Sequence, residues 1–468
     1  MAQCCREEIK MNKLQAGFSR VNINPPMGTP INGYYKPRYV EGVLDDLEIT
    51  TLALRVDDTK VLMMSIDNCL INAATCLPLR QHVADVTGVP VDAVFIHTTH
   101  THTAATIGNN SHAAEEPEEV MALLQEYHQF VRRRLGDAAR LALADLKDAK
   151  MGWSVGEAPN ISFVRRFRMA DGKVRTNPGV GNPDILHPIG DVDERVNVLR
   201  FDRADDTLVL ANFGCHPDTV GGSLISADWP GFARRRLEKA LDNVKCIFFN
   251  GAEGDVNHVN VKATKGDFND MFNDFDDVAR GYGHARHMGN VVAGAVLQVY
   301  DKVNYEDVDS LRYLQKVAKL PSNMPKPEDI PLARKYNDLH EAGKDDEIPF
   351  KGMELTTVVA EAARMLRLEH GPEYYDLGLG AVALGNIALF AIPGEPFTGI
   401  GRGLKEAEGW TLVMPMCLTN GSQGYFPMKD AYEEGGYEAR SSNYKVGTAE
   451  QIIVEGLEIL KELRDSAV

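Results

Sequence analysis

The chain has 468 residues, of which 44% are hydrophobic and 25% are charged, values typical of a large globular protein rather than a disordered segment. Its formal net charge of −17, from 67 acidic and 50 basic residues, repels a phosphate backbone and argues against nucleic-acid binding. There is no apolar run long enough to span a bilayer and no secretory signal at the start, so we expect a cytoplasmic location without stable membrane association. Seven cysteines without CxxC spacing also favour a reducing compartment.

Hydrophobic periodicity and turn residues predict an alternation of strands and helices along the chain. Strands are expected over 16–23, 49–56, 60–66, 91–96, 150–155, 195–201, 207–213, 246–250, 377–390 and 411–418. Helices are expected over 76–86, 118–146, 230–241, 279–303, 355–370 and 447–463. This order predicts an α/β fold in which layered mixed β-sheets are flanked by helices.

The sequence gives no sign of a boundary between independent modules, since it contains no internal repeat and no low-complexity tract. We therefore expect a single domain over residues 14–465. A charged, Pro- and Lys-rich stretch around 320–346 is expected to be an exposed excursion from that domain.

Three histidines follow the strand predicted over 91–96. If the backbone of the segment from His97 to His102 stays extended, His100 and His102 lie on one side and His97 on the other. Two imidazoles at this spacing can bind one metal ion or flank one substrate. The local excess of histidine favours a metal or catalytic role over a buried structural one.

Three other predicted strands also end in residues that can bind metals or move protons. His216 follows the strand over 207–213, Glu253 and Asp255 follow the strand over 246–250, and Glu395 stands between two prolines after the strand over 377–390. A histidine pair, a distant histidine and a glutamate match the ligand set of a hydrolytic zinc site. HExxH, GxSxG and phosphate-binding glycine motifs are missing from the sequence, which excludes zincins, serine hydrolases of that type and nucleotide-driven chemistry.

Taken together, these motifs resemble those of the neutral/alkaline ceramidases and occur in the same order. The matching segments are Thr99–His102, Cys215–Pro217, Glu253–Val256, Pro393–Glu395 and Tyr425–Ala439, with a similar opening over Gly17–Tyr34. The resemblance extends from about residue 16 to residue 463. It implies a ceramidase-like catalytic domain without the C-terminal immunoglobulin-like domain of that family, and a zinc-dependent amidase that cleaves N-acyl bonds.

The resemblance also implies roles for individual residues. One Zn²⁺ per chain would be bound by His100, His216, Glu395 and Tyr425. The catalytic residues would be His102, Arg165 and Tyr437, with Arg166 as the alternative to Arg165. In this mechanism a zinc-activated water attacks the amide carbonyl, Arg165 and Tyr437 stabilise the oxyanion, and His102 passes a proton to the leaving amine.

Two departures from the family pattern point away from ceramide as the substrate. The serine of the family's Gly-Asp-Val-Ser-Pro segment is Asn257 here, and the loop after His102 has a different sequence. An arginine cluster over 165–175 favours a polar or anionic substrate. We therefore expect a small-molecule amide more polar than ceramide.

Several alternatives stay open from the sequence. The protein could be a metal-dependent esterase or lactonase acting on a small hydroxylated or carboxylated metabolite, or a metal-dependent binding protein without catalysis. Iron or manganese could replace zinc in a mixed nitrogen and oxygen ligand set. Asp228 or Asp255 could bind a second ion or orient a histidine. A homo-oligomer is a further open alternative.

Overall fold

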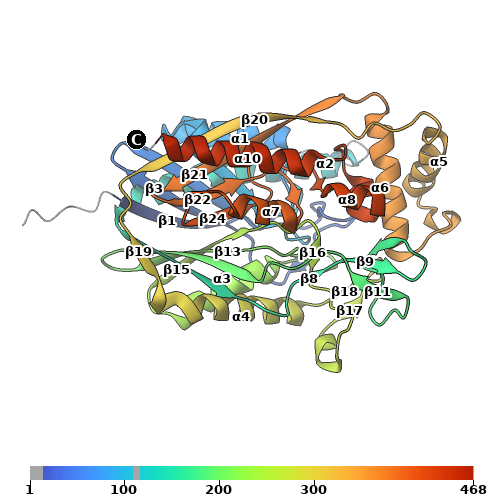
Figure 1. Cartoon of the computed structure of the whole chain (residues 1–468), viewed down its shortest axis with the longest axis horizontal. Coiled ribbons are helices and arrows are strands. Elements are labelled where there is room, and N and C mark those ends of the chain that lie inside the picture. Colours follow the sequence, from blue (N-terminus) through green and yellow to red (C-terminus); the bar gives the residue numbers. More distant parts are fainter. Residues whose placement is uncertain (1–13, 109–115, 467–468) are drawn as a thin grey trace, which may run out of the picture.

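The computed structural model describes residues 14–108 and 116–466, and its centre consists of three mixed β-sheets with helices on the outside (Figure 1). The first sheet contains, in spatial order, β5 (Val94–Thr98), β4 (Thr59–Ile66), β3 (Glu48–Val56), β1 (Leu14–Asn22) and β6 (Lys147–Asp148). The second contains β15 (Val244–Asn250), β13 (Thr207–Phe213), β12 (Arg195–Asp202), β7 (Lys150–Glu157) and β19 (Asn304–Glu306). The third contains β20 (Leu311–Pro321), β21 (Tyr374–Leu384), β22 (Ile387–Ala391) and β24 (Leu412–Met416). The predicted α/β fold of layered mixed sheets is confirmed.

The three sheets share one order of elements. Each has an antiparallel hairpin, β3–β4, β12–β13 or β21–β22, whose second strand pairs in parallel with β5, β15 or β24. A parallel pair requires a crossover connection, which contains α1 (Ala73–Thr87), α3 (Asp228–Ala240) and α7 (Thr398–Lys405), respectively. The chain thus repeats a hairpin–helix–strand unit three times, although no repeat is visible in the sequence.

Amphipathic helices cover the outer faces of the sheets (Figure 1). Helix α2 (Glu118–Ala144) lies on the first sheet because its apolar residues recur at helical spacing and are buried there, among them Leu124, Val131 and Leu135. Helices α3 and α4 (Tyr282–Val299) cover the second sheet, and α10 (Thr448–Asp465) covers the third. The helices predicted over 118–146, 230–241, 279–303 and 447–463 correspond to these four.

The parallel strands of the three units meet at the centre of the molecule. At the ends of β5 and β15, the Thr98 amide donates to the Leu418 carbonyl at 3.2 Å and the Cys417 amide donates to the Asn250 carbonyl at 3.1 Å. The Asn250 amide in turn donates to Nε2 of His97 at 2.9 Å. Burial lowers the pKa of His97 to about 3, so its ring is neutral and serves as an acceptor between sheets. His97 is therefore part of the framework that positions the following histidines.

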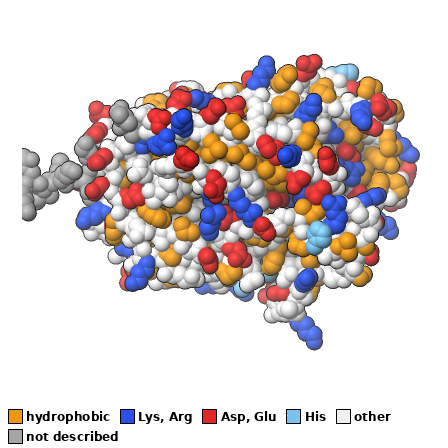
Figure 2. Space-filling model, viewed as in Figure 1, with side chains coloured by type: hydrophobic (Ala, Val, Ile, Leu, Met, Phe, Trp, Pro, Cys, Tyr) orange, Lys and Arg blue, Asp and Glu red, His pale blue; other side chains and the backbone are white. Residues whose placement is uncertain are grey.

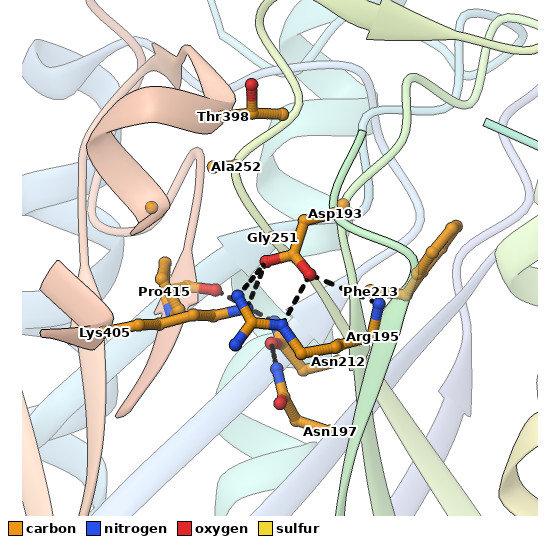
Figure 3. A pocket seen from close by; sticks show the side chains of 12 residues that line it. Asp193, Arg195, Asn197, Asn212, Phe213, Gly251, Ala252, Thr398, Lys405 and Pro415 are labelled. Atoms are coloured by element: carbon orange, nitrogen blue, oxygen red, sulfur yellow. Dashed lines mark hydrogen bonds and ion pairs between the residues drawn. The ribbon is translucent and has the colours of Figure 1, made fainter. Parts of the chain in front are cut away.

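A charge cluster at the border of the second and third units also joins them (Figure 3). Asp193 lies between Lys405 of α7 and Arg195 of β12, with oxygen to nitrogen distances of 2.6 Å and 2.7 Å. These cations keep the pKa of the Asp193 carboxyl well below its usual range, against the opposing effect of burial. The cavity beside them measures about 20 Å³, which admits a water molecule but not a substrate.

The segment over 320–346 contains the end of β20 and helix α5 (Ile330–Glu341), which packs against α6 (Gly352–Glu369). The sequence predicted α6 but neither α5 nor β20. That this segment is an exposed excursion from a single domain over 14–465 stays a prediction.

Side chains on the outside of the molecule are of mixed charge. On the face seen in Figure 2, acidic and basic side chains lie interspersed, so the negative net charge is not gathered into one patch there. In the described part of the chain, none of the helices combines the length and the apolar character needed to cross a bilayer.

Candidate metal centre

Four side chains from all three units converge between the ends of the strands. His100 lies in the turn after β5, and His216 lies in the turn after β13. Glu395 begins the short strand β23 (Glu395–Pro396), and Tyr425 begins β25 (Tyr425–Phe426). These two short strands pair in parallel with Glu395 opposite Tyr425, which explains why residues 30 positions apart in sequence lie side by side.

The histidine segment does not stay extended, so the condition for placing His100 and His102 on one side of a strand is not met. Strand β5 ends at Thr98, and His100 adopts a left-handed backbone with φ of 75°. A non-glycine residue in this region is strained and needs support from its surroundings. The His100 amide has that support, because it donates to the Asn68 carbonyl at 2.8 Å. The turn still brings His102 beside His100, with 3.3 Å between their Nε2 atoms.

Three distances between ligand-type atoms of the four residues are similar. Oε2 of Glu395 is 3.4 Å from Nε2 of His100 and 3.2 Å from Nε2 of His216. The hydroxyl of Tyr425 is 3.3 Å from the same nitrogen of His216. Ligand atoms about 2.0–2.1 Å from a tetrahedral zinc ion would lie about 3.3–3.4 Å apart. The spacing therefore fits a small tetrahedral cation at the centre of the group.

Hydrogen bonds behind the two histidines fix which ring nitrogen faces this centre. Nδ1 of His100 donates to the Cys69 carbonyl at 2.7 Å, and Nδ1 of His216 donates to the Glu253 carbonyl at 2.9 Å. In a neutral ring the Nε2 atoms then present lone pairs toward Glu395, whose Oε2 is buried and has no hydrogen-bond partner among the described residues. Converging lone pairs and an unpaired buried carboxylate oxygen are unfavourable unless a cation lies between them.

Glu253 belongs to the surroundings of this centre rather than to its ligand set. One potential ligand atom from each of Glu253, His100, His216 and Glu395 lies within 4.8 Å of the others. The Glu253 carboxylate, however, lies behind the His216 ring, 3.9 Å from Nδ1, and accepts hydrogen bonds from Asn250 and Cys417. The nitrogen of His216 that faces Glu253 is thus the one that already donates to a carbonyl.

Arg165 lies beside Tyr425, at the edge of the centre. Its Nε donates to Oε1 of the fully buried Glu438 at 2.6 Å, and its Nη2 donates to the Gly254 carbonyl at 2.8 Å. The guanidinium carbon is 5.3 Å from the centroid of the Tyr425 ring. Burial would lower the pKa of Arg165, but Tyr425 and Glu438 outweigh burial and raise it, so this residue is a fixed cation.

Arg166 points away from the centre. Its Nη2 donates to Glu434 at 3.2 Å and to the Gly435 carbonyl at 3.0 Å, and its guanidinium lies over the Phe397 ring. Of the two neighbouring arginines, only Arg165 contacts the Tyr425 region in this structure.

Tyr437 lies next to Tyr425, with 5.5 Å between their ring centroids in an edge-to-face arrangement. Tyr437 begins the short helix α9 (Tyr437–Ser441), and its amide donates to the Thr176 hydroxyl at 3.2 Å. Burial raises the pKa of the Tyr437 hydroxyl well above its ordinary value, so the group keeps its proton and can donate a hydrogen bond.

His102 is held in a second group of contacts. Its Nδ1 is 3.6 Å from Oδ1 of Asp218, and its ring lies 5.2 Å from the Tyr34 ring. Arg280 binds Asp218 through two hydrogen bonds of 3.0 Å and 2.8 Å, and the Tyr34 hydroxyl also donates to this carboxylate. Burial lowers the pKa of His102 well below its ordinary value, although Asp218 acts in the opposite direction. The ring is therefore neutral at neutral pH and can accept a proton.

Asp228 and Asp255, the candidates for binding a second ion, both accept hydrogen bonds from protein groups. One carboxylate oxygen of Asp228 accepts the amides of Thr219 and Val220 at 2.9 Å and 2.8 Å. Asp255 accepts the amide and the hydroxyl of Thr398 at 2.7 Å and 2.9 Å. Neither joins a cluster of possible metal ligands among the residues that the structure describes.

Sequence reasoning missed three residues that position the site. Asp218 follows His216 by two positions, and Glu438 lies within the Tyr425–Ala439 segment. Both are sequence neighbours of predicted site residues, and this proximity is a signal that could have indicated them. Cys69 acts through its carbonyl oxygen, and a backbone group leaves no signal in residue type.

No family model matches the chain, and no curated protein matches it. Among solved structures, a neutral ceramidase from Pseudomonas aeruginosa is similar, with a TM-score of 0.72 and 17% sequence identity over 97% of this chain and 75% of that chain. A structure described as ceramidase complexed with C2 is similar with a TM-score of 0.71 and 15% identity, covering 97% of this chain and 76% of that chain. The expected ceramidase-like fold is thus confirmed: over nearly all of its length, this chain has the fold of the neutral ceramidases.

Proposed function

We propose that this protein is a zinc-dependent hydrolase that cleaves the amide bond of an N-acyl compound. The observation that carries the proposal is the convergence of His100, His216 and Glu395 on one point, with the unpaired oxygen of Glu395 between two imidazole nitrogens. The fold shared with neutral ceramidases supports hydrolysis of an amide over other metal-assisted reactions.

His100, His216, Glu395 and Tyr425 would hold one zinc ion, and the second histidine ring next to them, His102, would face the substrate. Bound there, zinc would supply Lewis-acid chemistry and a hydroxide nucleophile at neutral pH. Tyrosine is an uncommon zinc ligand. Its place in the set comes from the resemblance to the ceramidases, and the 3.3 Å contact of its hydroxyl with His216 supports it.

The remaining side chains would act on the acyl group and the leaving amine. Arg165 is a fixed cation held from behind by Glu438, and Tyr437 keeps its proton, so both could donate hydrogen bonds to the oxygen of the acyl carbonyl as negative charge develops. The neutral ring of His102 could accept a proton and deliver it to the departing nitrogen. Without that proton the amine would be a poor leaving group.

The arginine cluster gives less support to an anionic substrate than its sequence suggested. Arg168 pairs with Glu434 at 2.9 Å, and Arg175 pairs with Asp171 at 2.7 Å. These positive charges are largely compensated by the protein. We keep the proposal of a substrate more polar than ceramide. Its support is the polar lining of the cavity between the loop over 175–182 and residues 273–277.

We also propose that the protein works in the cytoplasm. The five cysteines within the described residues are all buried and free, which suits a reducing compartment.

Hydrolysis of matched compounds tests the proposed function. The purified protein, stripped with a chelator and reloaded with zinc, is given N-octanoyl amino alcohols and the corresponding octanoate esters, and release of octanoate is measured. We expect hydrolysis of amides that requires zinc and is lost in Glu395→Gln. Glu157→Gln, which changes an exposed glutamate on β7, is the control. Hydrolysis of esters alone would favour the esterase alternative, and no hydrolysis by the zinc-loaded protein would contradict the proposal.

A further inference from the structure

A large cavity is lined in part by Thr176, which contacts Tyr437 and Glu438 at the edge of the candidate site. It measures about 630 Å³, a volume typical of small-molecule sites. Its walls are the loop over 175–182, the hairpin of β17 (Phe272–Asn273) and β18 (Ala279–Arg280), and the beginning of α6. Part of the wall thus comes from the segment after β20.

The cavity wall is joined to the predicted catalytic residues by direct contacts. Thr176 accepts the amide of Tyr437 and donates to Glu438 at 2.8 Å, and Glu438 holds Arg165. The amide of Asn177 donates to the Arg165 carbonyl at 2.8 Å. A ligand that contacts this wall would therefore be one residue away from the groups predicted to bind the acyl carbonyl.

Asp276 makes a similar link on the other wall. It binds Arg280 through hydrogen bonds of 2.7 Å and 2.8 Å, and Arg280 binds the Asp218 carboxylate beside His102. Each wall of the cavity is thus connected to the site by hydrogen-bonded side chains, Glu438 with Arg165 on one side and Arg280 with Asp218 on the other.

The chemistry of the lining is polar. Nine of the fifteen lining residues have polar or charged side chains, including Asn177, Asn182, Asn273, Asp277 and Lys351. Among the described residues, neither Asn273 nor Lys351 has a side-chain hydrogen bond or ion pair, so water must solvate both. An alkyl chain in the cavity would remove that water without replacing its hydrogen bonds, which is unfavourable.

Amide groups donate and accept hydrogen bonds, and so do hydroxyl groups. Asn177 and Asn182 each have a hydrogen-bond partner in the protein, so Asn273, Lys351 and Asp277 are the groups left for a ligand. An amide, a cation and a carboxylate together suit a ligand that carries several hydroxyl groups better than one with a single strong charge. We propose that this cavity binds a hydroxyl-rich portion of the substrate, about the size of a sugar ring, while the amide bond lies at the metal centre. This inference rests on the proposed hydrolase function and names the class of its substrate.

A pair of substrates that differ only in their hydroxyl groups tests the inference. N-Octanoyl-glucosamine carries the hydroxyl groups, and N-octanoyl-cyclohexylamine has a ring of similar size without them. We expect kcat/KM for the glucosamine compound to be higher by about tenfold or more, because polar groups of the site stay unpaired with the other ring. Equal rates on both compounds, or a preference for cyclohexylamine, would overturn the inference and leave the proposed hydrolase intact.

Two neighbouring substitutions on β17 locate the effect. Asn273→Trp places a large side chain in the cavity wall, whereas Phe272→Trp changes the adjacent residue, which is 53% exposed and does not line the cavity. We expect Asn273→Trp to lower the preference for the glucosamine compound by about tenfold and Phe272→Trp to leave it unchanged. Thermal unfolding and zinc content of both variants verify that they are folded and loaded.

A binding measurement covers the case in which no amide is hydrolysed. Calorimetric titration with N-octyl-glucosamine, an amine without an amide bond, measures binding in the absence of hydrolysis, and the two variants show whether that binding involves the cavity. Binding by the wild type that Asn273→Trp weakens and Phe272→Trp preserves would support the inference even if the proposed hydrolysis failed. Absence of binding, or equal binding by both variants, would overturn it.

Discussion

The rings of His100 and His216 are held in the same way, each by a backbone carbonyl that accepts from Nδ1. This contact fixes the tautomer and directs Nε2 toward Glu395, so the ligands are oriented before any ion binds. His102 differs, because its Nδ1 is 3.6 Å from the nearest carboxylate oxygen, too far for a hydrogen bond. Its ring is therefore freer to exchange a proton.

Replacement of His102 distinguishes a proton carrier from a ligand. We expect His102→Ala to lower kcat for amides by about 100- to 10,000-fold, the usual contribution of general acid–base catalysis, and to keep the full zinc content. Steady-state kinetics and elemental analysis of the same sample give both quantities. Loss of zinc together with activity would show that His102 is a ligand, contrary to this account.

Arg165 offers a second test at the residue scale. We expect Arg165→Ala to lower kcat by about 100- to 1,000-fold, since one donor to the developing oxyanion would be lost. The control is Arg168→Ala, because Arg168 is partly exposed and binds Glu434 instead. Similar activities of the two variants would remove Arg165 from the mechanism.

At the scale of elements, the site depends on short strands that approach other backbone segments closely. Gly254 lies directly under β23, and a Cβ atom at this position would be 2.5 Å from the Glu395 carbonyl oxygen. The φ angle of Gly254 is not in the left-handed region, so backbone conformation does not require a glycine there. The lack of space for a Cβ atom does.

A methyl group at Gly254 is expected to displace Glu395. Gly254→Ala should weaken zinc binding by about 10- to 100-fold, the range seen when the support of a ligand is lost. Competition with a chromogenic chelator measures the affinity. Gly294→Ala in α4, where a Cβ atom meets nothing within 4 Å, should leave zinc affinity unchanged and stabilise the helix by about 0.5–1 kcal/mol. Equal zinc affinity in the two variants would contradict this role of Gly254.

At the scale of the whole molecule, three hairpin–helix–strand units surround one centre and each contributes ligands to it. The first contributes His100, the second His216, and the third Glu395 and Tyr425. The units are tied together by the buried His97 and by the Asp193 charge cluster. Because the centre needs all three, we expect loss of the folded core and loss of the site to occur together.

Buried neutral histidines make the stability of this core depend on pH. His258 is buried with Nε2 donating to the Ala279 carbonyl at 2.7 Å, and burial lowers its pKa to about 4. In the unfolded chain the ring takes up a proton below about pH 6.5, whereas in the folded protein it stays neutral down to about pH 4. The free energy of unfolding therefore falls as the pH decreases through this window, by up to about 3 kcal/mol at about 1.4 kcal/mol for each pKa unit.

Urea unfolding of the variant His258→Gln at several values between pH 7.5 and pH 4 measures this contribution. We expect the loss of stability across the window to be smaller in the variant than in the wild type. The same substitution at the exposed His187 serves as a control and should preserve the wild-type pH dependence. A variant at position 258 whose stability falls as steeply as that of the wild type would contradict the account.

Strong periodic patterns were predictable from the sequence, and contacts between distant segments were not. Helix α2 was predicted because its apolar residues recur at helical spacing, and the β3–β4 hairpin was predicted because two short apolar stretches flank a polar turn over 57–59. Helix α7 was missed, since its eight residues include three glycines, and its position depends on Asp193 and Asp255 from other units.

Within the site, residue types at strand ends indicated His100, His216 and Glu395, whereas Tyr425 and Arg165 came only from the resemblance to a family. The sequence contained no sign of the left-handed turn at His100, because that turn is supported by the Asn68 carbonyl rather than by local residue preference. The roles of Cys69 and Gly254 also depend on backbone atoms of other segments, which residue types alone do not reveal.

Elemental analysis of the purified protein tests the central claim most directly. The wild type is compared with His100→Ala, His216→Ala and the exposed control His187→Ala, each after reconstitution with zinc and removal of the excess. The account predicts about one zinc ion per chain in the wild type and the control, and none in the other two variants. A wild type that binds no metal, or variants at positions 100 and 216 that keep it, would contradict the account.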